Sequence, residues 1–178
     1  MDPRSLLGAL ASVLAMSLAG SLLAGCPYPF PLESESGDQD AGANSPPVIV
    51  RVDAPYQPPG PIILDTEAIG LGVPPEPMTV VVSDIDRDDQ VFVYFYVDYG
   101  NPGPTPARNE CSGSAGSVNR TLSCQIDRLC QDIEPPATGL LLEAMVVDRV
   151  PNLSGDPLFR ALPEGTGRSF QSWLLQCE

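Results

Sequence analysis

The stretch QVFVYFYVDY, residues 90–99, is the part of the sequence that indicates the fold most clearly. It is rich in aliphatic and aromatic residues that favour strands, and successive side chains of a strand point to opposite faces of a sheet. The alternation predicts one core-facing set and one outward set: Val91, Val93, Phe95 and Val97 toward the core, and Phe92, Tyr94, Tyr96 and Asp98 away from it.

On both sides of this stretch, short apolar runs alternate with clusters of Pro, Gly and Asp, a pattern typical of antiparallel sandwiches. Proline recurs too often for long helices. We expect residues 140–148 to lie centrally in their sheet, and we expect the last strand to bury the face that carries Trp173. The sequence predicts seven strands, at residues 48–52, 62–69, 78–83, 90–99, 118–126, 140–148 and 168–177.

The strand order, with an Asp-rich turn before an aromatic strand that ends Val97-Asp98, resembles immunoglobulin-like and fibronectin type III-like domains of bacterial surface proteins. The resemblance covers residues 47–178 and implies an all-β fold, a single immunoglobulin-like antiparallel β-sandwich. Such sandwiches carry many unrelated functions, so the resemblance implies a shape and no activity.

The N-terminal 25 residues have the layout of an export signal, with Arg4 followed by an uncharged run from residue 5 to residue 25. Leu23-Ala24-Gly25-Cys26 resembles the lipobox of bacterial lipoprotein precursors. The resemblance implies cleavage before Cys26, a diacylglycerol on its thiol and an acyl chain such as palmitate on the new amine. Lipid chains contribute about 0.8 kcal/mol for each buried methylene, so two or three of them would hold the protein on a membrane.

Two alternatives remain for this segment. The 21 uncharged residues are long enough for an uncleaved membrane helix, which needs about 20. The run contains three glycines and four serines, however, and no cationic stop follows it. The second alternative is a secreted protein cut near Ala24.

Residues 26–46 follow as the acylated cysteine and a tether rich in Pro and acidic residues. Such a segment has little to bury, and about twenty flexible residues span on the order of 25 Å. By the same resemblance, an aspartate after the acylated cysteine favours retention in the inner membrane, and Pro27 stands there instead. We therefore expect sorting to the outer membrane, on its periplasmic face or at the cell surface, by the lipoprotein processing and sorting machinery.

Composition limits the remaining functions. The 153 residues after the signal suffice for one domain, and they carry 22 acidic residues against 8 arginines. So acidic a chain is repelled by nucleic acid, which we exclude as a partner. The whole sequence has no histidine, which removes the commonest general base and transition-metal ligand.

Four cysteines follow Cys26, an even number that suggests two disulfides in an exported chain. Three pairings are possible. We favour Cys111 with Cys124, closing a Gly/Ser-rich loop, and Cys130 with Cys177, tying a mid-chain loop to the last strand. A zinc site is the alternative, although the cysteines lack the close spacing of zinc ligands.

The segment SDIDRDD, residues 83–89, is the one candidate metal site. It places carboxylates at Asp84, Asp86 and Asp88, and Asp98 and Asp148 stand near strand ends. Oxygen ligands at alternate positions suit calcium. The alternative is a hairpin turn whose aspartates accept backbone hydrogen bonds, and the Gly and Glu of an EF-hand loop are missing.

Catalytic motifs are absent from the sequence: no GxSxG, HExxH, P-loop or GxGxxG occurs, and a serine would lack its histidine base. We expect no enzyme, with a carboxylate-based hydrolase as a minor alternative. Tyr94, Tyr96 and Tyr99 have two interpretations, an exposed aromatic patch or packing on the outer face of the sheet. The expected function is a lipid-anchored envelope protein that presents a non-catalytic binding or structural module to a protein or glycan partner, or alternatively an accessory subunit of an envelope complex.

Overall fold

The computed structural model describes residues 44–178, so the predicted signal, Cys26 and almost all of the tether lie outside the described residues. The described chain is almost entirely strand, with one short helix. Its elements, in chain order, are β1 (Val48–Val52), β2 (Ile62–Leu64), α2 (Thr66–Gly70), β3 (Met78–Ser83), β4 (Val91–Val97), β5 (Asn109–Gly113), β6 (Asn119–Cys124), β7 (Ala137–Val147) and β8 (Arg168–Cys177).

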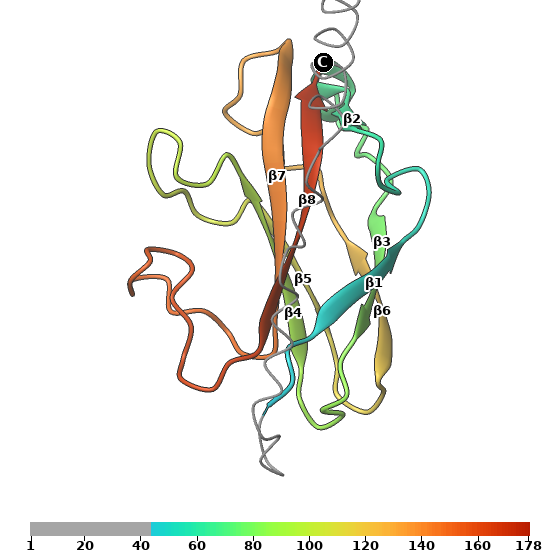
Figure 1. Ribbon diagram of the computed structural model, residues 1–178. Helices are drawn as coiled ribbons and strands as arrows, with labels where there is room; N and C mark the ends of the chain where they lie inside the picture. The colour runs from blue at the N-terminus through green and yellow to red at the C-terminus, as the bar shows by residue number, and fades with distance from the viewer. Residues whose placement is uncertain (1–43) are drawn as a thin grey trace, which may run out of the picture. The chain divides into compact units, whose positions relative to one another are not determined.

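The strands form two sheets packed face to face, which confirms the predicted all-β sandwich (Figure 1). One sheet has the order β1-β3-β6 and the other β2-β8-β7-β4-β5. All neighbours are antiparallel except β2, which runs parallel to β8. This is an immunoglobulin-like arrangement in which, within residues 44–178, the three-stranded sheet has no fourth strand beyond β6.

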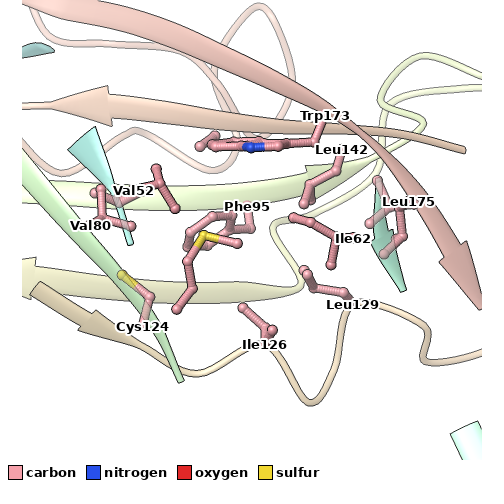
Figure 2. Close-up of a cluster of buried hydrophobic side chains, with 14 of the residues drawn as sticks. Val52, Ile62, Val80, Phe95, Cys124, Ile126, Leu129, Leu142, Trp173 and Leu175 are labelled. Carbon is pink, nitrogen blue, oxygen red and sulfur yellow. The ribbon is translucent and has the colours of Figure 1, made fainter. Parts of the chain in front are cut away.

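The face of β4 predicted to line the core does so. Val91, Val93 and Phe95 are completely buried and belong to the same core cluster as Trp173 and Leu175 of β8, and Figure 2 shows Phe95 in that cluster. The face of β8 that carries Trp173 is the buried one, as the sequence indicated. β7 lies between β4 and β8, which confirms the predicted central position of residues 140–148.

The predicted strand at residues 62–69 is wrong in its second half. β2 ends at Leu64, and Asp65 begins the short helix α2 by accepting a hydrogen bond from the backbone N–H of Ala68, at 2.9 Å. Asp is a favoured N-cap residue, and here the cap prevails over the apolar alternation that suggested a longer strand.

β5 is an additional strand, which lies between the predicted strands at residues 90–99 and 118–126. Its five residues, NECSG, contain almost no apolar side chain, so they carry no hydrophobic alternation. The strand forms because β4 offers it a complete antiparallel partner, from Val91 opposite Gly113 to Phe95 opposite Asn109. Tertiary pairing thus overrides a weak local preference.

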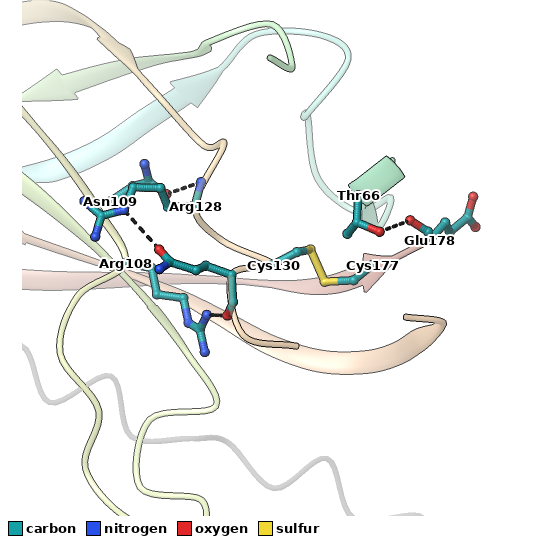
Figure 3. Close-up of a disulfide and its surroundings, with 8 residues drawn as sticks. Thr66, Arg108, Asn109, Arg128, Cys130, Cys177 and Glu178 are labelled. Atoms are coloured by element: carbon teal, nitrogen blue, oxygen red, sulfur yellow. Dashed lines mark hydrogen bonds between the residues drawn. A yellow bond between two sulfur atoms is a disulfide. The ribbon is translucent and has the colours of Figure 1, made fainter. Parts of the chain in front are cut away.

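Two disulfides join the cysteine pairs that the sequence favoured. Cys111 on β5 is bonded to Cys124 at the end of β6, so this bond links the two sheets on the side where the fourth strand is missing. Cys130, in the loop between β6 and β7, is bonded to Cys177 at the end of β8 (Figure 3).

The loop that carries Cys130 is also fastened to β5. The side chain of Asn109 donates to the carboxylate of Asp127 at 3.2 Å. It also accepts from the backbone N–H of Arg128, at 3.2 Å (Figure 3). Asn109 is itself buried. These contacts hold the loop against the edge of the five-stranded sheet.

The two ends of the sandwich differ in what they carry. The first described residues lie at the end with the β3–β4 and β5–β6 turns, whereas Glu178 lies at the opposite end near β2 and α2 (Figure 1). The backbone N–H of Glu178 donates to Leu64, and its carbonyl accepts from Thr66. The aspartate-rich turn therefore belongs to the end at which the described chain begins.

Candidate functional site

The β3–β4 turn, which contains the candidate metal ligands, is built around Asp84. The backbone N–H of Asp84 donates to Val118 at 2.8 Å, which ties the turn to the β5–β6 connection. One carboxylate oxygen of Asp84 accepts from the backbone N–H of Asp86, two residues on, at 3.0 Å. Aspartates form such local turns readily, so the sequence folds here as its composition suggests.

The other oxygen of Asp84 forms a buried ion pair with Arg120 of β6. The two charged atoms lie 3.1 Å apart, and the side chains are 0 % (Asp84) and 4 % (Arg120) exposed. The same guanidinium donates to the backbone carbonyls of Asp86 and Arg87, at 3.1 and 3.3 Å. Arg120 thus neutralises the first predicted metal ligand and closes the turn, a role that sequence reasoning missed. An isolated arginine at an alternating position of β6 was the available signal.

Asp86 and Asp148 hold the segment that leads into β1. A carboxylate oxygen of Asp86 accepts from the backbone N–H of Ser45 at 2.7 Å. The side chain of Asn44 donates to Asp148 and, at 2.8 Å, to the carbonyl of Gly165. The aspartates at this end therefore fix the position at which the chain enters the sandwich.

Gly167 makes this attachment possible. A side chain at this position would begin 2.7 Å from the Cα of Pro46 and 2.8 Å from a carboxylate oxygen of Asp148. The backbone N–H of Gly167 also donates to that carboxylate, at 2.9 Å. Only glycine allows the incoming segment, Asp148 and the end of the β7–β8 loop to meet so closely.

An open hollow of about 610 Å³ lies beside this attachment. Burial raises the pKa of Asp89, and the carboxylates of Asp148, Asp84 and Asp86 add to that effect. The hollow is shallow and polar, without the apolar walls typical of a small-molecule pocket. Its lining residues are Asn44, Ile85, Asp86, Arg87, Asp88, Asp89 and Arg149.

The three predicted calcium ligands have different surroundings. Asp84 is paired with Arg120, Asp86 binds the backbone of Ser45, and Asp88 is exposed. Asp98 lies elsewhere, where it binds the backbone of Leu141. Among residues 44–178, no three acidic, His or Cys side chains are grouped so that they could hold a metal ion. This geometry favours the hairpin-turn alternative.

We therefore expect calcium and magnesium to have equal effects on stability. The melting temperature of the purified protein should shift alike in both ions at matched ionic strength, because both only screen an acidic surface. A specific site would instead stabilise by about 2.7 kcal/mol at a hundredfold excess of calcium over its Kd. A calcium-specific rise that Asp88→Asn abolishes would restore the calcium interpretation.

The aromatic residues on the outer face of β4 are packed under the β7–β8 loop, so the exposed-patch interpretation is wrong. Tyr96 is completely buried and Tyr94 nearly so. The hydroxyl of Tyr96 donates to the carbonyl of Phe159 at 2.9 Å, and that of Tyr99 donates to Leu158 at 2.6 Å. Burial raises the pKa of Tyr96 to about 12, although the cation of Arg160 opposes the shift.

Arg160 fastens this loop to the sheet. Its guanidinium lies 4.1 Å from the ring centroid of Tyr96 and 3.6 Å from that of Tyr99. It also forms an ion pair with Glu143 of β7, at 3.0 Å. Cation–π contacts at desolvated sites contribute on the order of 2 kcal/mol, so the tyrosines have a structural role and help to hold the loop on the sheet.

Comparison of the sequence with models of protein families finds no match, and comparison with curated proteins finds none either. Within residues 44–178, the short helix α2 is the longest helix, and no helix has the length and apolar character needed to cross a membrane.

Proposed function

We propose that this chain is a lipid-anchored protein of the cell envelope that presents a non-catalytic immunoglobulin-like module for binding or structural support. The observation that carries the proposal is the attachment of residues 44 and 45 to Asp86 and Asp148. Because residues 44 and 45 are fixed to the domain, a tether that precedes them would connect to the domain without a flexible joint. The lipobox and the Pro-rich, acidic residues 26–46 supply the anchor and tether.

Three features support a role without catalysis. The sequence has no histidine, the buried carboxylate of Asp84 is neutralised by Arg120, and the hollow at the acidic end is open. Hydrolysis by paired carboxylates needs a preorganised cleft, whereas the hollow at the acidic end is open to solvent. Two disulfides suit an oxidising compartment outside the cytoplasm.

The proposal places the domain on the outer membrane. By resemblance to lipoprotein precursors, Cys26 carries the lipid, and residues 27–43 give the module a reach of roughly 20–25 Å from the headgroups. The acidic end beside the tether is repelled by anionic lipid, which favours a domain that stands clear of the surface.

Replacing Cys26 with serine tests the anchor. We expect the variant to leave the membrane fraction or to accumulate as an unprocessed precursor, because its side chain cannot form the thioether to diacylglycerol. Fractionation followed by mass determination of the N-terminal peptide measures both outcomes. Cys111→Ser/Cys124→Ser is a matched control, since it removes cysteines outside the lipobox. A normally cut Cys26→Ser variant that stays in the membrane would refute the lipid anchor.

A further inference from the structure

The outer face of the five-stranded sheet is only partly covered. Near the start of β8, the β7–β8 loop lies on this face and buries Tyr96 and Met145 completely. Near the end of β8, three aliphatic side chains on this face are exposed: Leu174 is 56 % exposed, Leu141 of β7 is 43 % exposed and Ile63 of β2 is 51 % exposed. These three residues, which we call the apolar patch, have no covering element within residues 44–178.

The apolar patch is continuous across three neighbouring strands. Leu141 and Leu174 are direct partners in the β7–β8 register. Ile63 is opposite Gln176, the next outward residue after Leu174, so it is the diagonal neighbour of that leucine. Single exposed aliphatic residues are ordinary on a protein surface, whereas large contiguous groups are characteristic of interaction sites.

Acidic residues border the apolar patch. Asp65 follows β2 directly, two residues after Ile63. Asp98 and Leu141 exchange two hydrogen bonds, from the N–H of Asp98 to the carbonyl of Leu141 at 2.8 Å and from the N–H of Leu141 to the carboxylate at 2.7 Å. Glu178 donates its backbone N–H to Leu64 at 2.9 Å. In the described part of the chain, none of these three carboxylates forms an ion pair.

We propose that the apolar patch docks a partner protein whose contacting surface is apolar and bordered by lysine or arginine. A second copy is disfavoured as the occupant, because residues 44–178 carry 18 acidic residues against 8 arginines and two acidic borders would face each other. An anionic lipid surface is disfavoured for the same reason. The inference refines the binding role proposed above and does not depend on the lipid anchor.

The test is site-specific photocrosslinking of the full-length protein in the cells that make it. A photoreactive residue replaces Leu174 in one variant and Val50 in the other. Val50 is a matched control, because it is also 56 % exposed on a strand but lies on β1 of the other sheet. We expect a discrete adduct from position 174 alone. We also expect mass spectrometry to show that the crosslinked segment of the partner is flanked by lysine or arginine. Added salt should reduce the yield of the adduct, because it screens the attraction between opposite charges.

Combining the photoreactive residue at position 174 with Leu141→Ser should lower the adduct yield about tenfold, the loss expected from one buried leucine. Combination with Val50→Ser should leave it unchanged. Melting temperatures of the serine variants should match the parent, since both positions are exposed. The proposal would be overturned by equal adducts from both positions or by no adduct at all. It would also be overturned by a dimer of this chain, a lipid adduct or a crosslinked partner segment that is acidic. Fractionation of Cys26→Ser tests the anchor separately.

Discussion

Replacing Arg120 with methionine should destabilise the domain by about 3–5 kcal/mol, because it leaves the carboxylate of Asp84 buried without its counter-charge. The variant also loses the hydrogen bonds that close the β3–β4 turn on the carbonyls of Asp86 and Arg87. The fluorescence of Trp173, the single tryptophan and a core residue, would report the shift in a urea titration.

Two further variants distinguish burial of charge from loss of any ion pair. Arg51→Met breaks the pair with Asp53, whose side chains are 62 % (Arg51) and 43 % (Asp53) exposed. It should cost at most about 1 kcal/mol, as exposed pairs do. Asp84→Leu combined with Arg120→Met should recover much of the loss, since no unpaired charge remains. Equal effects of Arg51→Met and Arg120→Met would contradict the role assigned to the buried pair.

Removing the Cys130–Cys177 disulfide by a double serine substitution should destabilise by about 4 kcal/mol. The bond closes a chain segment with a sequence separation of 47, and the unfolded chain gains the entropy of that loop when the bond is absent. The Cys111–Cys124 bond, with a separation of 13, should be worth about 3 kcal/mol by the same relation.

Chemical denaturation of the two double variants measures this difference directly. Each variant keeps one disulfide, so each is the control for the other. The variant without Cys130–Cys177 should also show the larger increase in m-value, because its unfolded chain becomes less compact. If removing the Cys111–Cys124 bond cost more stability than removing Cys130–Cys177, chain entropy would not be the main contribution. Packing around Cys111 would then dominate.

Much of the fold was predictable because the alternation of apolar and polar residues in the core strands indicates which face is buried. In β4 one face is continuously apolar, and in β8 one face carries Trp173, Leu175 and Cys177, so the period-two pattern identifies the buried face without tertiary information. β5 was not predictable in this way, because NECSG gains its strand conformation from pairing with β4. The end of β2 was missed because the capping hydrogen bond of Asp65 decides it.

The candidate site was predictable in its location but not in its chemistry. The cluster at Asp84, Asp86 and Asp88 marked the correct turn, and a hairpin was one of the two interpretations. Its partners, Arg120 and Ser45, are separated from it by more than thirty residues in the sequence. Contacts across that distance depend on the sheet topology, which the local pattern does not contain.

The position of Arg160 over Tyr96 and Tyr99 has a consequence for aggregation. The seven residues of β4, VFVYFYV, are uncharged and strongly β-prone, the composition of segments that stack into amyloid-like fibrils. One face of this strand is sealed by the core, and much of the other lies beneath the loop that Arg160 fastens. Its edges are occupied by β7 and the short β5, and Asp98 follows it as a charged gatekeeper. The contacts of Arg160 thus help to keep this fibril-prone segment away from other copies of the chain.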